Sequence, residues 1–171
     1  MNVTLVPFGN SKFNGAELEC QHGEDECTAN SWEQCAITLY PKFSTHWPFY
    51  LCVETAAKAC GEGAGPCVLP KIEGCATGSG LDYSMLSGCV GDKKLANRLQ
   101  HEFAALTPSD HSYVPWVVVE GKPLKNSEAL VKHVCQKYKG ANKPAACAKA
   151  EAQTVADAAF TSSNAACPAA W

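Results

Sequence analysis

The sequence lacks the closely paired cysteines that its high cysteine content would lead one to expect. Eleven of the 171 residues are cysteines, yet no two of them are separated by only two residues. This absence excludes the usual start of a zinc knuckle, and it leaves the chain without the Cys-x-x-Cys turn of a dithiol redox centre. We therefore predict no metal site and no cofactor, and no catalytic cysteine can be named.

Long apolar runs and an excess of basic residues are also missing. No stretch approaches the roughly 20 apolar residues of a membrane span, so no transmembrane segment is predicted. With 14 Lys and Arg against 17 Asp and Glu, the net charge of -3 gives no electrostatic case for nucleic acid or an anionic membrane. No serine-nucleophile motif and no phosphate-binding glycine loop are found either.

The abundance of cysteine indicates a compartment. A reducing cytosol seldom holds so many cysteines without a metal, so an oxidising lumen, secretory or endolysosomal, is the better interpretation. Because eleven is odd, at least one cysteine is free or is paired outside the chain. The cysteines expected to form disulfides, in a pairing that the sequence leaves open, are Cys20, Cys27, Cys35, Cys52, Cys67, Cys75, Cys89, Cys135 and Cys147.

The start of the chain is not a signal peptide, because Val3–Phe8 lacks both a basic leader and a small-residue cleavage site. A lumenal disulfide protein requires such a signal, so we expect Met1 to be an internal residue of a longer precursor. Val3–Pro7 itself is β-branched and apolar, which predicts a buried strand. Asn2 begins a glycosylation sequon, and burial at this strand would hide it from the sugar-transferring machinery.

The most informative stretch is Cys20–Cys35, which holds three cysteines within sixteen residues. Between Cys20 and Cys27 the sequence is acidic and polar, as is typical of a loop closed by a short disulfide. Asn30 is then expected to cap a helix, with Glu33 in the capping-box position. Judged on its residues alone, the stretch is a disulfide-stapled loop that leads into a helix.

Written as C-Q-H-G-x-x-E-C-x-x-N-x-x-x-x-C, this stretch resembles the signature of the gamma-interferon-inducible lysosomal thiol reductase family. Asn2–Asn10, Tyr113–Leu124 and Val134–Gly140 resemble the same family in the same order, so the resemblance spans about Asn2 to Cys147. The signature residues are Cys20, Gln21, His22, Gly23, Glu26, Cys27, Asn30 and Cys35. His22, beside a cysteine, either tunes a thiolate or, as is commoner, caps a loop through a hydrogen bond.

The resemblance implies a thioredoxin-like α/β fold whose first strand–helix unit, carrying the redox Cys-x-x-Cys, is absent from this chain. Residues 1–147 would form the thioredoxin-like domain, with a cysteine-rich helical insertion at about 31–106. Residues 148–171 would be an Ala-rich helix or tail, anchored by Cys167. Without the first strand, backbone groups and apolar surface would be left unpaired. A longer N-terminus would supply that strand, or another protein chain would; the first is favoured.

Patterning also predicts the elements of the insertion. Pro41 is expected to end a first helix, and Trp47-Pro48 to open a second. Glycine-rich loops are expected at Gly61–Gly65 and Gly74–Gly80. Asp82 and Asp92 should each cap a further helix. The face of the helix that follows Asp92 is expected to consist of Leu95, Leu99, Phe103 and Leu106.

The last third of the chain predicts a hairpin and a helix, which is the closing half of a thioredoxin-like fold. Pro115–Val119 is expected to be a strand, Glu120-Gly121-Lys122 a tight turn, and the residues from Ser127 a helix that ends at Gly140. By resemblance, Pro115 has a cis peptide bond and faces the redox dithiol, and Val114 offers its backbone to an extended substrate. From the residues alone, Pro115 is a strand-entry proline.

The function that the resemblance implies is thiol–disulfide oxidoreduction of disulfide-containing protein substrates, which assists their unfolding and proteolysis in lysosomes. An alternative is a catalytically silent, disulfide-stapled subunit of a larger assembly. The missing Cys-x-x-Cys, the odd cysteine count and the Ala-rich tail favour that alternative. A third hypothesis, a secreted disulfide-rich binding module, leaves the hairpin and Pro115 unexplained.

Overall fold

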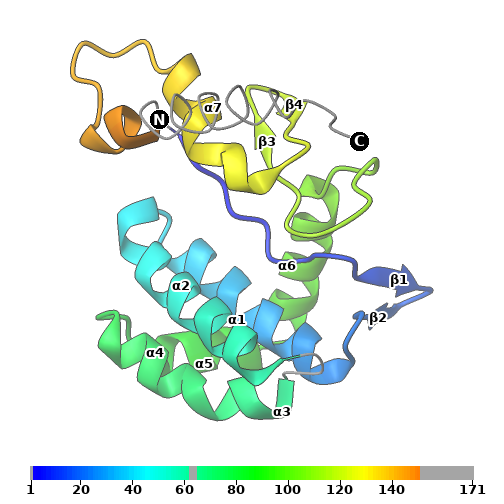
Figure 1. Cartoon of the computed structure of the whole chain (residues 1–171). Coiled ribbons are helices and arrows are strands. Elements are labelled where there is room, and N and C mark those ends of the chain that lie inside the picture. Colours follow the sequence, from blue (N-terminus) through cyan, green and yellow to red (C-terminus); the bar gives the residue numbers. More distant parts are fainter. Residues whose placement is uncertain (1, 62–64, 151–171) are drawn as a thin grey trace, which may run out of the picture. The chain divides into compact units, whose positions relative to one another are not determined.

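The structure is a computed structural model of the whole chain, and it describes residues 2–61 and 65–150. The chain divides into two compact units, Met1–Val114 (unit 1) and Pro115–Trp171 (unit 2). Both units mix helices with small antiparallel sheets, so the α/β class is confirmed in this general sense (Figure 1).

Unit 1 is mainly helical. A short hairpin comes first, in which β1 (Lys12–Asn14) pairs antiparallel with β2 (Glu17–Glu19). In unit 1, α1 lies beside α2, α5 and α6 (Figure 1). The helices are α1 (Glu24–Leu39), α2 (Phe43–Cys60), α3 (Gly65–Val68), α4 (Ile72–Gly78), α5 (Tyr83–Gly91) and α6 (Lys93–Leu106), with a 3-10 turn at Leu69–Lys71.

The strand predicted at Val3–Pro7 is not formed in the structure. This segment is extended without a partner strand, and its Pro7 carbonyl instead accepts a hydrogen bond from Gln34 Nε2 at 2.9 Å. The burial that the pattern predicted is found only at Pro7 and Phe8, whereas Asn2 is exposed. The prediction was wrong because an apolar β-branched run becomes a strand only where a neighbouring strand supplies the ladder.

The predicted start of the first helix was also wrong. α1 begins at Glu24, seven residues before the position expected from an Asn30 cap, and its N-cap is Gly23 with a φ of 96°. Its first turn is acidic throughout, which stabilises the positive end of the helix dipole. Glu33, assigned to a capping box, instead lies inside the helix and is buried.

Two further predictions concerned prolines and glycines. Pro41 does separate the first two helices, but α2 begins at Phe43, so Pro48 lies inside the helix rather than in its first turn.

Most of the loop predicted at Gly74–Gly80 is helical, because α4 continues to Gly78. Burial of Ile72, Cys75 and Ala76 on α4 outweighs the poor helix propensity of glycine. Of the loop predicted at Gly61–Gly65, residues 62–64 lie outside the described residues.

Both predicted aspartate caps are confirmed. Asp82 Oδ1 accepts hydrogen bonds from the amides two and three residues further on, at 2.8 and 3.2 Å. Asp92 does the same at the start of α6, at 3.1 Å for both amides. On α6, Leu99 and Phe103 are buried as expected, whereas Leu106 is exposed.

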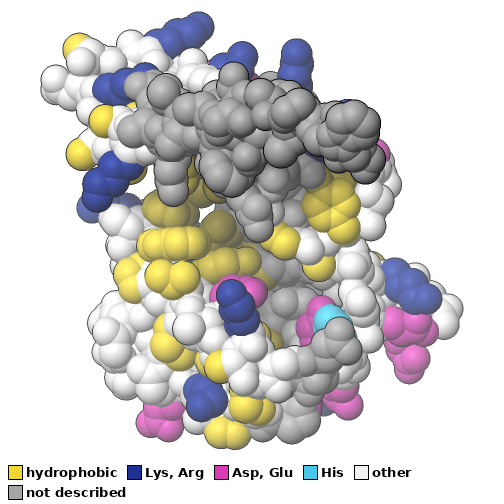
Figure 2. Space-filling view, in the orientation of Figure 1, with side chains coloured by type: hydrophobic (Ala, Val, Ile, Leu, Met, Phe, Trp, Pro, Cys, Tyr) yellow, Lys and Arg dark blue, Asp and Glu magenta, His cyan; other side chains and the backbone are white. Residues whose placement is uncertain are grey.

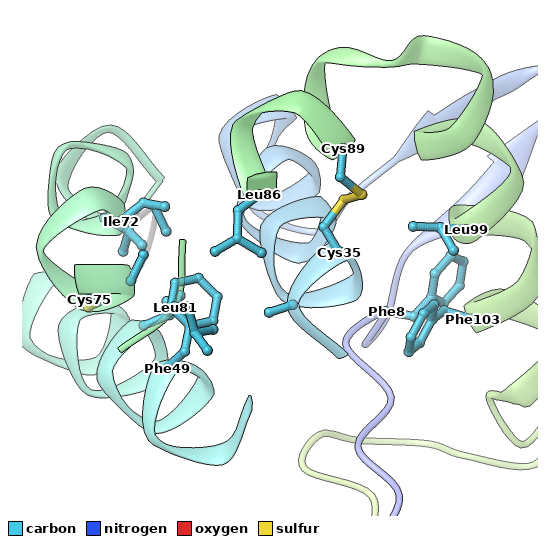
Figure 3. Packing of buried hydrophobic residues seen from close by; sticks show 14 residues of the cluster. Phe8, Cys35, Phe49, Ile72, Cys75, Leu81, Leu86, Cys89, Leu99 and Phe103 are labelled. Atoms are coloured by element: carbon cyan, nitrogen blue, oxygen red, sulfur yellow. A yellow bond between two sulfur atoms is a disulfide. The ribbon is translucent and has the colours of Figure 1, made fainter. Parts of the chain in front are cut away.

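The core of unit 1 lies between these helices (Figure 3). The Cys35–Cys89 disulfide crosses it between Leu86 on one side and Leu99 on the other, and Phe8 and Phe103 lie next to Leu99. Nearer the surface, side chains of Phe43, Trp47 and Tyr50 stack along α2, with ring centroids 5.3 and 6.0 Å apart. Hydrophobic side chains gather around the start of that helix (Figure 2).

Unit 2 contains the predicted hairpin and a helix, although that helix ends at Lys137 rather than at the predicted Gly140. β3 (Val118–Val119) pairs antiparallel with β4 (Lys122–Pro123) across a two-residue turn. Glu120 and Gly121 both have positive φ, 50° and 76°, as a type I′ turn requires. The strand is shorter than the predicted Pro115–Val119. A 3-10 turn at Ser127–Ala129 leads into α7 (Leu130–Lys137), and residues 145–150 are helical. Within the described ranges, no helix is long and apolar enough to cross a membrane.

Candidate functional site

The Cys20–Cys35 stretch forms a stapled corner between the β1–β2 hairpin and α1. Cys20 follows β2, and Cys27 lies in the first turns of α1; their disulfide holds the two Cα atoms 5.6 Å apart. The hydroxyl of Ser11 donates a hydrogen bond to Cys20 Sγ at 3.1 Å. This disulfide therefore fixes the direction in which the chain enters its first long helix.

His22 and Glu26 are joined within this corner. Glu26 Oε2 accepts a hydrogen bond from the backbone N–H of His22 at 2.6 Å and lies 3.2 Å from Nδ1 of its ring. Next to His22, Gln21 Oε1 accepts a hydrogen bond from Asn10 Nδ2 at 2.8 Å. These contacts support the loop-capping interpretation of His22 over a role beside a thiolate. Gly23 follows with a φ of 96°, which few residues other than glycine adopt.

The remaining signature residues belong to α1. Asn30 is partly buried along the helix rather than at its start. Cys35 is fully buried and pairs with Cys89 of α5 across 54 residues of sequence. The structure therefore gathers the signature into one corner and one helix, where the contacts described here shape the chain.

Five disulfides are present among the described residues, so disulfide bonding is confirmed. They include all nine cysteines singled out from the sequence, and Cys60, which was not singled out, is the tenth. Cys167 lies outside the described residues. The pairs are Cys20–Cys27, Cys35–Cys89, Cys52–Cys75, Cys60–Cys67 and Cys135–Cys147.

Val114 and Pro115 lie at the junction of the two units. Both are exposed, and Val114 Cγ1 would be 3.9 Å from a Cβ atom added to Gly9. Gly9 belongs to the Asn2–Asn10 segment that also resembles the family. Asn2 is itself exposed, so burial no longer argues against its glycosylation, which stays a prediction.

A buried carboxyl on α1 was not predicted from the sequence. The Glu33 side chain is almost fully buried, and its Oε1 has no hydrogen-bond partner among the described residues. Burial first, and the nearby charge of Glu54 second, raise the pKa of Glu33 well above its ordinary value. Elsewhere in residues 2–61 and 65–150, no cluster of His, Cys, Asp and Glu could hold a metal ion.

Comparison with known proteins identifies the relatives of this chain. A model of the gamma interferon inducible lysosomal thiol reductase (GILT) family matches residues 1–69. The gamma-interferon-inducible lysosomal thiol reductase of Mus musculus is 36% identical over 157 residues, which is 86% of this chain and 58% of that protein. The chain belongs to the GILT family. The resemblance seen in the Cys20–Cys35 signature is thereby confirmed.

Other GILT relatives match a similar share. The gamma-interferon-responsive lysosomal thiol protein of Arabidopsis thaliana is 33% identical over 147 residues, 81% of this chain and 57% of that protein. The Carassius auratus thiol reductase is 35% identical over 162 residues, 86% of this chain and 59% of that protein. The chain therefore spans less than two thirds of the length of these curated GILT proteins.

Proposed function

We propose that the protein to which this chain belongs is a thiol–disulfide oxidoreductase that reduces disulfides of protein substrates in an oxidising endolysosomal lumen. The observation that carries this proposal is the 36% identity over 157 residues to a protein named as a lysosomal thiol reductase. The five disulfides of the described residues support an oxidising compartment, because a reducing cytosol would keep such cysteines in the thiol form.

The proposed reaction needs two thiols that these 171 residues do not offer as a Cys-x-x-Cys pair. A thiolate attacks one sulfur of the substrate disulfide, forms a mixed disulfide and expels the other sulfur as a thiolate. A second enzyme thiolate then attacks the mixed disulfide, which releases the reduced substrate and leaves an enzyme disulfide. We assign this dithiol to the part of the relatives' length that the chain does not span. Pro115 and Val114 would then flank it and offer backbone to the substrate.

The hairpin of unit 2 supports a thioredoxin-like sheet with a further strand beside β3. Leu124 N donates to Val117 O at 2.8 Å, so in an antiparallel ladder Val118 and Pro123 face each other as a pair without mutual hydrogen bonds. The backbone nitrogen of Pro123 then points to the outer edge of β4. Because proline has no N–H, this nitrogen cannot donate a hydrogen bond to a further strand on that side. β4 is thus suited to be the edge strand, which leaves β3 to pair further inward.

Exposed apolar side chains of unit 2 support the same proposal. Val118 on β3 is 43% exposed and Val131 on α7 is 50% exposed, although both belong to elements that should bury an apolar face. An isolated two-stranded hairpin is only marginally stable in water, so a larger sheet would stabilise this one. A strand–helix unit carrying the dithiol would provide the missing partner.

The second candidate function is a catalytically silent subunit. The same exposed Val118 and Val131 could be covered by another protein chain, and the sequence contains no Cys-x-x-Cys. On this alternative the disulfide-stapled helices of unit 1 would serve assembly rather than redox chemistry.

The mass of the native protein, with and without reduction and alkylation, separates the two candidates. A mass well above 18.2 kDa, together with a Cys-x-x-Cys peptide after digestion and reduction of a disulfide-containing protein substrate, supports the reductase. A mass of 18.2 kDa, with no reductase activity, would remove the reductase proposal and direct the search to a partner chain.

A further inference from the structure

The interface between α1 and α2 holds a carboxyl group without a counter-charge. Glu33 lies in the middle of α1, is only 2% exposed, and its Oε1 has no hydrogen-bond partner among the described residues. No ion pair of the described part of the chain involves Glu33. An ionised carboxylate in such a position loses its hydration and gains nothing in return.

The ionisable groups of α2 that interact electrostatically with Glu33 are acidic. Tyr50 and Glu54 lie four residues apart on one face of α2, and the pKa of Tyr50 is raised by burial, then by Glu33 and Glu54. Glu54 is an exposed residue; desolvation of its carboxyl first, and the charge of Glu26 second, raise its pKa. Ionisation of any one of these carboxyls therefore makes ionisation of its neighbour harder.

Cations on the surrounding elements are engaged elsewhere or exposed. The His22 ring lies 3.2 Å from Glu26, at the start of α1. On α6, Arg98 lies 3.7 Å from Glu102, and His101 stacks on Phe13. On α2, His46 is buried, and its Nδ1 lies 2.7 Å from the backbone O of Tyr40. The other ionisable side chains on elements packed against α1 are Glu17 and Glu19 of β2, Lys58 of α2, Lys71 of the 3-10 turn, Tyr83 of α5, and Lys93 and Lys94 of α6, all surface or half-buried positions.

No disulfide joins α1 to α2. The cysteines of α1 pair with Cys20 and with Cys89 of α5. The cysteines of α2 pair with Cys75 of α4 and Cys67 of α3. The contact between these two helices therefore depends on noncovalent interactions, and the uncompensated carboxyl lies at that contact.

We propose that the α1–α2 interface is a pH-sensitive contact, which is closed most stably when Glu33 carries a proton and is weakened when Glu33 must ionise. At acidic pH the neutral carboxyl is tolerated in the interior. At neutral pH there are two ways for the chain to respond. Glu33 remains protonated at a cost in stability, or it ionises and α1 loosens from α2 so that water reaches the carboxylate.

The sign of the effect follows from the raised pKa of Glu33. Below the ordinary value near 4.5 the folded and unfolded chains are both protonated at this residue, so its full contribution to stability is present. As the pH rises, the unfolded chain loses the proton first, and stability falls until the pH passes the pKa of the folded state. Glu54 acts in the same direction, because its pKa is also raised.

The test is denaturant unfolding of the disulfide-intact chain between pH 4.5 and 7.5, for the native sequence and for Glu33→Gln. Glutamine keeps the shape but cannot ionise. For the native chain we expect the unfolding equilibrium constant to rise by up to about tenfold per pH unit, the limit for one proton, relative to Glu33→Gln. The matched control is Glu73→Gln, at an exposed acid of α4, which should keep the native pH dependence.

Two results would overturn the proposal. One is a Glu33→Gln chain whose stability depends on pH as steeply as that of the native chain. The other uses the native chain only, and so does not depend on how well the variant folds: carboxyl carbon resonances from NMR that show Glu33 titrating near 4.5. Neither result bears on the reductase proposal, because the inference concerns unit 1 alone.

Discussion

At the scale of single residues, the GILT signature is explained here by local contacts. Glu26 accepts the backbone N–H of His22 and lies near its ring, Gln21 binds Asn10, and Gly23 adopts a positive φ. Each contact fixes the corner through which the chain enters α1. The spacing of the signature therefore reflects a stapled loop followed by the first twelve residues of α1.

Replacing Glu26 with alanine should weaken this corner. The variant loses the acceptor for the His22 N–H at 2.6 Å, and the cost expected for a capping contact is about 1 kcal/mol of unfolding free energy. Since the His22 ring is 42% exposed, its ion pair with Glu26 should contribute little. Denaturant unfolding at constant pH measures the effect. Glu24→Ala, at the exposed start of the same helix, should cost only a few tenths; equal losses would contradict the assignment.

At the scale of elements, local chain geometry decides the hairpin of unit 2. Its two-residue turn requires positive φ at Glu120 and Gly121, and glycine meets this requirement without strain. The register of β3 and β4 follows from that turn, and Pro123 then determines which strand lies at the edge.

Gly121→Ala should destabilise the hairpin by about 1 kcal/mol, because an L-residue at a φ of 76° carries a steric cost. The amide of Leu124, which donates to Val117 across the ladder, should then exchange with solvent about fivefold faster. The control is Gly88→Ala in α5, where nothing lies within 4 Å of the added Cβ and alanine favours the helix. An unchanged exchange rate at Leu124 in Gly121→Ala would rule out the type I′ turn.

At the scale of the whole molecule, disulfides distribute the stability of unit 1 unevenly. Cys35–Cys89 closes a long loop through the core, whereas Cys60–Cys67 and Cys20–Cys27 each join cysteines only seven positions apart, near the surface. The α1–α2 contact has no disulfide of its own, and it carries Glu33. A lumenal protein of this design would be held by covalent bonds overall and would respond to pH at one contact.

Removing Cys35–Cys89 should cost more than removing Cys60–Cys67. Chain entropy predicts losses of roughly 4 kcal/mol for the separation of 54 and roughly 2 kcal/mol for the separation of 7, before the cavity in the core is counted. The paired variants Cys35→Ala with Cys89→Ala, and Cys60→Ala with Cys67→Ala, are compared by denaturant midpoint and slope. Equal losses would show that loop length does not govern these disulfides.

Elements with local signals were predicted best. Asp82 and Asp92 act as caps because the hydrogen bonds of a cap run to amides two and three residues away. The turn at Glu120-Gly121 depends on two residues only. Val3–Pro7 failed for the opposite reason, since a strand depends on a partner that the pattern does not contain.

The candidate site was foreseen only in part. The signature and the cysteines were found because residue types and spacing are written in the chain. Glu33 was misassigned, because the capping-box pattern around Asn30 is also satisfied by residues inside a helix that begins earlier. Whether a glutamate faces water or the interior depends on which helix packs against it.

The sequence by itself determined the family, through the Cys20–Cys35 signature, and the places where helices are capped and turns are made. Those features depend on residues that are close together in the sequence, so they can be predicted without knowing how the chain folds. Tertiary structure alone decided which cysteines pair, that Val3–Pro7 finds no strand, and that Glu33 is enclosed between α1 and α2. These outcomes depend on residues far apart in sequence, whose approach is decided by packing of the whole core.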